Sequence, residues 1–189
     1  MMKPVLRTVL YATICALLPL FTLPAEAKNI IDTRHNLSIS GPGEIKSLSE
    51  TRVCIFCHTP HNATPNTPLW NREVRSQNYS LYSSSTMRST PLQPNGPSRL
   101  CLSCHDGTIA LGAVLQPTGG ISMISQITPG SPANVGANMN LSGDHPFSFS
   151  YYDALSNPNI NPVPPADLAF YSDGGMGGFI ECTTCHDPH

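Results

Sequence analysis

The sequence has few charged and few aromatic residues. Charged side chains make up 12% of the chain and aromatic side chains 7%, whereas an ordinary soluble domain has roughly 25% charged residues. The formal net charge is only −2, which disfavours nucleic acid and acidic membrane surfaces as partners. Aliphatic surface is too sparse for a large independent core, and the chain has 19 Pro and 14 Gly. We therefore expect it to fold around a cofactor.

The sequence also lacks a run suited to a membrane span. Its apolar run at 9–23 is short, follows two basic residues and precedes the small-residue site Ala25-Glu26-Ala27, which is the pattern of a cleaved signal peptide. We expect residues 1–27 to be removed on export, leaving a single domain at 28–189. The mature protein is then periplasmic or extracellular, soluble or attached to a surface.

No cysteine is left over for a structural disulfide. Cys15 lies in the signal peptide, and the other six cysteines all belong to Cys-x-x-Cys-His motifs at 54–58, 101–105 and 182–186. Six cysteines in an exported protein ordinarily suggest a disulfide framework, and Cys-x-x-Cys pairs also occur in zinc sites. Neither explains a histidine after every pair, whereas covalent haem attachment requires one. The motifs therefore predict three haems c.

Each motif assigns roles to its residues. The two thiols bond to the haem vinyl groups, and the histidine that follows binds the iron as a neutral imidazole. The predicted attachment residues are Cys54, Cys57, Cys101, Cys104, Cys182 and Cys185. The predicted proximal ligands are His58, His105 and His186.

Four further histidines are candidates for the second iron ligand: His35, His61, His145 and His189. An isolated histidine is ordinarily a surface or hydrogen-bonded residue, but here the number is close to that of the irons. His61 and His189 each follow a proximal ligand by three residues, with a proline between, so neither can reach the opposite face of the same ring. Each is expected to bind a neighbouring haem.

Methionine is the competing second ligand. The mature methionines have no repeated relation to the motifs, which favours bis-histidine haems of low potential; they are Met87, Met123, Met139 and Met176. Three irons need three second ligands, so one of the four histidines is left over. It serves a haem attached beyond residue 189 or in an adjacent subunit, or it is simply solvated, as His35 on an N-terminal arm would be.

Regular secondary structure is expected to be sparse. Turn residues and the absence of periodicity predict irregular segments at 29–43, 64–97 and 116–143, with a break at 174–178. Short helices are predicted at 44–51, from Ser98 as N-cap to about residue 115, and at 166–171 after two prolines, with a short strand within 144–152. The expected fold is mostly irregular with a few short α-helices and haem as its core. Trp70, Tyr79 and Tyr82 are expected to pack on haem.

Several stretches of this sequence resemble the doubled Cys-x-x-Cys-His class of multihaem cytochromes c, which is prominent in metal-reducing bacteria. They are Cys-Ile-Phe-Cys-His-Thr-Pro-His-Asn-Ala at 54–63, Pro-Leu-Trp-Asn at 68–71, Cys-Leu-Ser-Cys-His-Asp-Gly-Thr-Ile at 101–109, Asp-His-Pro at 144–146 and Cys-Thr-Thr-Cys-His-Asp-Pro-His at 182–189. The resemblance implies bis-histidine ligation and electron delivery outward from the periplasm, and some members form filaments. This chain stops at His189, where members commonly continue to another motif.

Electron transfer without substrate turnover is the expected function, with redox proteins as partners, no nucleic acid and no membrane span. A reductase of a small oxyanion is the alternative. It needs an iron with an open position, whereas histidines are in surplus here and no Cys-x-x-Cys-Lys variant occurs. A filament subunit or other homo-oligomer is compatible with the first function.

Overall fold

The computed structural model describes residues 29–65, 67, 69–172 and 178–189. The predicted signal peptide at 1–27, Met176 and most of the predicted break at 174–178 lie outside these residues. Most of the described chain is irregular. Its regular elements, with η for 3₁₀ helices, are η2 Ile30–Asp32, η3 Cys54–Phe56, α2 Gly96–His105, η4 Ala137–Met139, β1 Phe149–Ser150, α3 Tyr151–Ala154, β2 Phe179–Ile180 and α4 Cys182–Cys185.

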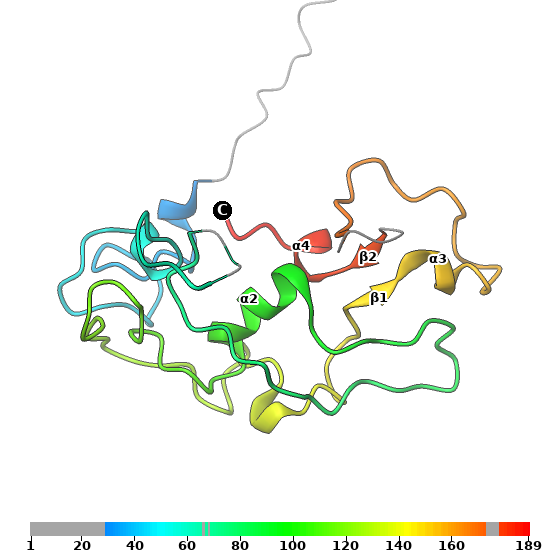
Figure 1. The fold of residues 1–189 in the computed structure, drawn as a ribbon, viewed down its shortest axis with the longest axis horizontal. Coiled ribbons are helices and arrows are strands. Elements are labelled where there is room, and N and C mark those ends of the chain that lie inside the picture. The colour runs from blue at the N-terminus through cyan, green and yellow to red at the C-terminus, as the bar shows by residue number, and fades with distance from the viewer. Residues whose placement is uncertain (1–28, 66, 68, 173–177) are drawn as a thin grey trace, which may run out of the picture.

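Helix α2, which includes the second motif, lies in the middle of the molecule, between the segments that carry the first and third motifs (Figure 1). The N-terminal segment with η2 and η3 lies on one side, whereas the sheet β1–β2 and α3 lie on the other. Helix α4 packs against α2. The C-terminus returns toward the N-terminal segment (Figure 1), so the end of the third motif reaches the side that carries the first.

Helix α2 carries the second motif, but its bounds differ from the prediction. It begins earlier, where Asn95 is the N-cap and its side chain accepts a hydrogen bond from the Gly96 N–H at 2.8 Å. It ends at His105 and does not continue to residue 115, because Asp106 is the C-cap and Gly107 adopts a positive φ of 70°. Ser98, predicted as the N-cap, lies inside the helix and is fully buried.

The helix predicted at 44–51 does not form. The backbone of this segment forms hydrogen bonds with residues outside the segment. The Ser47 N–H donates to Leu37 O at 2.8 Å and the Leu48 N–H to Ser122 O at 2.9 Å. Glu50 O accepts from the Ile39 N–H at 2.7 Å. These long-range bonds fix the approach to the first motif. Tertiary pairing has overridden a weak local propensity.

The strand predicted within 144–152 is shorter than expected. Only β1, Phe149–Ser150, is a strand; it pairs antiparallel with β2, with Phe149 opposite Ile180, and α3 follows at once. The helix predicted at 166–171 is absent, because Tyr171 N–H donates to Phe179 O at 3.0 Å and thereby extends the pairing beside β2. This small sheet leads directly into the third motif.

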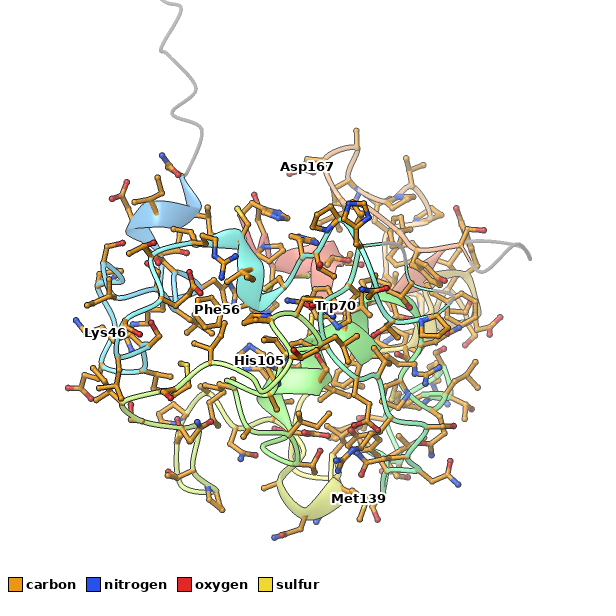
Figure 2. All side chains as sticks on the ribbon, turned by 60° about the vertical axis from the view of Figure 1, so that its left-hand side comes forward. Lys46, Phe56, Trp70, His105, Met139 and Asp167 are labelled. Carbon is orange, nitrogen blue, oxygen red and sulfur yellow. The ribbon has the colours of Figure 1, made fainter. Side chains whose placement is uncertain are left out.

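The apolar core of the described residues is small. Leu102, Leu141 and Phe147 form its central cluster, and partly buried Tyr79 and Cys182 are among the residues packed against it. Figure 2 shows Phe56, Trp70 and His105 toward the middle of the molecule and Lys46, Met139 and Asp167 at its periphery. Many of the fully buried side chains are polar, including Asn36, Ser47, Asn71, Arg72, Ser98 and Glu181. Hydrogen bonds to backbone therefore hold much of this fold.

Candidate functional site

The first motif lies on a tight turn. The 3₁₀ helix η3 covers Cys54 to Phe56, and the His58 N–H donates to the Cys54 carbonyl at 2.8 Å. This turn brings the two cysteines and the histidine together, with Phe56 buried beneath at 1% exposure. The Trp70 ring lies 6.0 Å from the His58 ring at 83°, and its buried indole N–H has no hydrogen-bond partner among the described residues. Trp70 is therefore placed to contact a group bound at His58.

The second motif occupies the last turn of α2. Nδ1 of His105 lies 2.7 Å from the carbonyl oxygen of Ala133. A carbonyl only accepts, so Nδ1 carries the proton and Nε2 keeps its lone pair. A metal-binding histidine characteristically donates its other N–H in this way, which fixes the orientation of its ring.

The third motif forms helix α4. Glu181 is its N-cap in a capping box with Thr184, and the His186 N–H donates to the Cys182 carbonyl at 2.9 Å. Ser98 of α2 connects the two motifs, since its hydroxyl accepts from the Cys182 N–H at 2.9 Å and donates to Glu181 Oε2 at 2.5 Å. Burial raises the pKa of Glu181, and its Oε1 is buried without a partner in the described chain.

Each motif histidine faces a different histidine from outside the three motifs. The ring centroids of His58 and His189 are 6.2 Å apart at 7°, and those of His145 and His186 are 6.5 Å apart at 20°. The centroids of His35 and His105 are 6.0 Å apart at 83°. Three of the four candidate second ligands are thus each brought to a separate proximal candidate.

The spacing within these pairs suits one metal ion between two imidazoles. With bonds of about 2 Å to nitrogen, rings on opposite sides of an ion have centroids about 6 Å apart. Rotation about the nitrogen–metal axis leaves that spacing unchanged, so both the parallel and the perpendicular pairs fit. Except for half-buried His105, the paired rings lie exposed on the polypeptide.

The second members of two pairs also have defined tautomers. Nδ1 of His35 lies 3.2 Å from the carbonyl oxygen of Pro188, and Nδ1 of His145 lies 3.3 Å from that of Pro146. As in His105, the proton is on Nδ1 and Nε2 is left for a metal. Partial desolvation by the surrounding chain, and then the nearby His105, lower the pKa of His35, which favours the neutral form that binds metals.

His61 is the candidate that the structure does not pair. It is exposed, and no aromatic or histidine ring lies against it in the described part of the chain. Its backbone is held by Thr59, whose hydroxyl donates to the His61 carbonyl at 2.8 Å. Among the four candidate second ligands, His61 is thus the one without a histidine partner in the described residues, whereas the sequence suggested His35 as the surplus histidine.

The six motif cysteines are free thiols. Cys101 and Cys182 are hydrogen-bonded through their side chains, which raises the pKa of Cys101 and lowers that of Cys182. Burial raises the pKa of Cys57 to about 12, with a further contribution from nearby Cys104. One cysteine of the second motif is therefore near the first motif, and the other is near the third, which makes the second motif the central one.

Of the three predicted aromatic anchors, Tyr79 packs on protein. Its ring contacts the cluster around Leu102, and its hydroxyl donates to Asp106 Oδ2 at 2.7 Å, which together with burial raises the pKa of the phenol. Trp70 lies beside His58, and Tyr82 is half-buried. The sequence did not single out Arg72, a buried residue beside the second motif; it is one of three charged residues within 72–75, so its charge gave no distinguishing signal.

Other features of the described residues do not form a second site. No group of three or more His, Cys, Asp or Glu side chains converges there as a metal site. A cavity of about 630 Å³ is lined by residues such as Glu73, Arg75, Thr108 and Gln126 and by no motif residue. None of the helices in this part of the chain is long and apolar enough to cross a membrane.

No protein-family model matches the chain, and no curated protein matches it.

Proposed function

We propose that the chain is a multihaem c-type cytochrome that carries electrons and does not turn over a substrate. Three haems would be attached through the six motif cysteines, and the residues that would hold their irons are the pairs His58–His189, His105–His35 and His186–His145. The single observation that carries the proposal is this pairing of every motif histidine with its own second histidine, at 6.0 to 6.5 Å between ring centroids.

The number of protein ligands favours haem over zinc. A haem supplies four nitrogen donors, so its iron needs only two imidazoles from the protein. A structural zinc site needs about four protein ligands. Among the described residues, no group of three or more His, Cys, Asp or Glu side chains converges on one point. Once bound, haem supplies reversible one-electron chemistry.

The chain's own residues hold and orient the ligands. The carbonyls of Ala133, Pro188 and Pro146 fix the Nδ1 protons of His105, His35 and His145. If both imidazoles of a pair held the same iron, no position would remain for a substrate, which favours electron transfer over oxyanion reduction. The signal-peptide pattern supports a location in the periplasm or outside the cell, and redox proteins or further copies of the chain are the proposed partners.

Production of the chain with a c-type haem attachment system tests this proposal. The pyridine haemochrome assay should give three haems per chain, and the spectra should be those of low-spin iron in both oxidation states. Carbon monoxide should not bind rapidly to the reduced protein. Rapid stoichiometric binding would favour the reductase alternative, and a chain that acquires no haem would refute both.

A further inference from the structure

Arg72 is a buried arginine between the first and second motifs. Its side chain is 0% exposed, and its guanidinium donates hydrogen bonds to the carbonyls of Ser103, at 2.9 Å from Nη2, and Leu111, at 2.7 Å from Nη1. The preceding residue, Asn71, donates its backbone N–H to the Cys57 carbonyl at 2.8 Å. The dipeptide 71–72 therefore joins the backbone beside Cys57 to the backbone beside Cys104.

Arg72 forms no ion pair with a carboxylate of the described chain. The ion pairs found there are Arg52–Glu50 and Arg75–Glu73, and the hydrogen-bond partners of Arg72 are carbonyl oxygens. Carbonyl dipoles solvate a guanidinium but leave its unit charge in place, and an unpaired buried charge is ordinarily too costly to retain. Retention of this one points to a negative charge, or to a change of charge, near it.

The field of Arg72 reaches both neighbouring motifs. Nη2 of Arg72 bonds to the carbonyl of Ser103, directly before Cys104, and the backbone of Asn71, directly before Arg72, bonds to the carbonyl of Cys57. These cysteines are the attachment points of two haems under the proposed function. A buried charge is screened far less than an exposed one, so its effect extends over the size of a cofactor.

We propose that Arg72 is a potential-tuning residue, which raises the reduction potentials of the haems at the first and second motifs relative to the haem at the third. The inference rests on the proposed function. One-electron reduction lowers the charge of a redox centre by one, so a nearby buried cation stabilises the reduced state. At about 10 Å and an effective dielectric constant of about 20, one unit charge changes such an equilibrium by about tenfold.

The test compares three variants of the haem-loaded protein by spectroelectrochemical titration, with haem methyl NMR signals assigning each potential to its haem. Arg72→Met removes the buried charge, Arg72→Lys retains it without the forked hydrogen bonds, and Arg75→Met removes a charge that is exposed and paired with Glu73. Arg72→Met should lower two of the three potentials by about 59 mV, the equivalent of tenfold for one electron. Arg72→Lys and Arg75→Met should shift them much less.

A second variant, at an exposed position, tests the proposal if Arg72→Met yields no stable protein. Ala110 is exposed, and its carbonyl accepts from Arg72 Nη2 at 3.2 Å, so Ala110→Glu adds a negative charge near Arg72 without opening the core. Ala110→Glu should lower the same two reduction potentials, but by less than Arg72→Met does.

The outcomes separate the two proposals. A wild-type chain without haem would refute the proposed function itself. Three haems with unchanged potentials in both Arg72→Met and Ala110→Glu would overturn only the role of Arg72. Equal shifts in Arg72→Lys and Arg72→Met, or an equal shift of the third haem, would show that Arg72 acts only through packing.

Discussion

The His58 and His189 rings are nearly parallel, at 7°, with centroids 6.2 Å apart, although one belongs to the first motif and the other follows the third. The same C-terminal segment includes His186, which faces His145, and Pro188, whose carbonyl holds Nδ1 of His35. Residues 186–189 thus contact a member of every histidine pair. The C-terminal segment 186–189 therefore contacts all three candidate haem sites.

Replacement of His189 with Ala tests the pairing at the first motif. Because the cysteines and His58 remain, we expect the variant to retain three haems, but one of them should become five-coordinate. Carbon monoxide should then bind to one third of the reduced haem, as measured by the optical difference spectrum.

His61→Ala is the matched control, since His61 follows its motif at the same spacing but pairs with no ring in the described structure. The purified variant should keep three low-spin haems and bind no carbon monoxide. The opposite result, with His61→Ala opening a site and His189→Ala leaving all sites closed, would show that the histidine pairs do not hold the irons.

Replacement of Cys101 with Ala should cost more than one redox centre. Helix α2 packs on α4, and Cys101 lies against Cys182 of the third motif, so loss of the central haem exposes its neighbours. We expect limited proteolysis to digest the variant rapidly and haem content to fall below two per chain. A compact, protease-resistant protein that still holds two haems would demonstrate independent sites.

The sequence names candidate residues for the site but not their arrangement in space. The motifs themselves name the attachment residues and proximal candidates, because haem attachment demands a fixed local spacing. Pairing such as His35 with His105 depends on contacts between distant segments, which no local pattern encodes. The 44–51 segment failed as a helix for the same reason, since its backbone bonds to 37–39 and 122.

Replacement of Asn71 with Ala should destabilise the fold, because the Asn71 side chain connects the first motif to the backbone of Gln116. The Asn71 side chain donates to Ile55 O at 2.6 Å and Gln116 O at 2.7 Å, and accepts from Gln116 N–H at 2.8 Å. Loss of three buried hydrogen bonds should cost about 3 kcal/mol, measured by urea unfolding of the haem-loaded protein. Asn159→Ala, at an exposed position, is the control, and an equal loss of stability in both variants would contradict the role of Asn71.

Glu181 should make stability depend on pH. Burial raises the pKa of its carboxyl above the ordinary value of 4.5, because the charged form loses hydration that the bonds from Ser98 and Ser148, at 2.5 and 2.7 Å, only partly replace. A group whose pKa rises on folding binds its proton more tightly in the folded state. Its contribution to stability is therefore fully present below pH 4.5 and is lost as the pH rises through the folded pKa.

Glu181→Gln removes this titration but keeps the shape of the side chain and an oxygen to accept from the two hydroxyls. We expect the wild type to lose stability relative to the variant as the pH rises from about 4 to about 8, a range that begins near the ordinary pKa of a carboxyl and extends well above it. Urea unfolding at a series of pH values measures the difference, with Glu44→Gln as the control at an exposed carboxyl. A difference between wild type and Glu181→Gln that stays constant with pH, or that grows in favour of the wild type, would show that the buried carboxyl gains its charge without penalty.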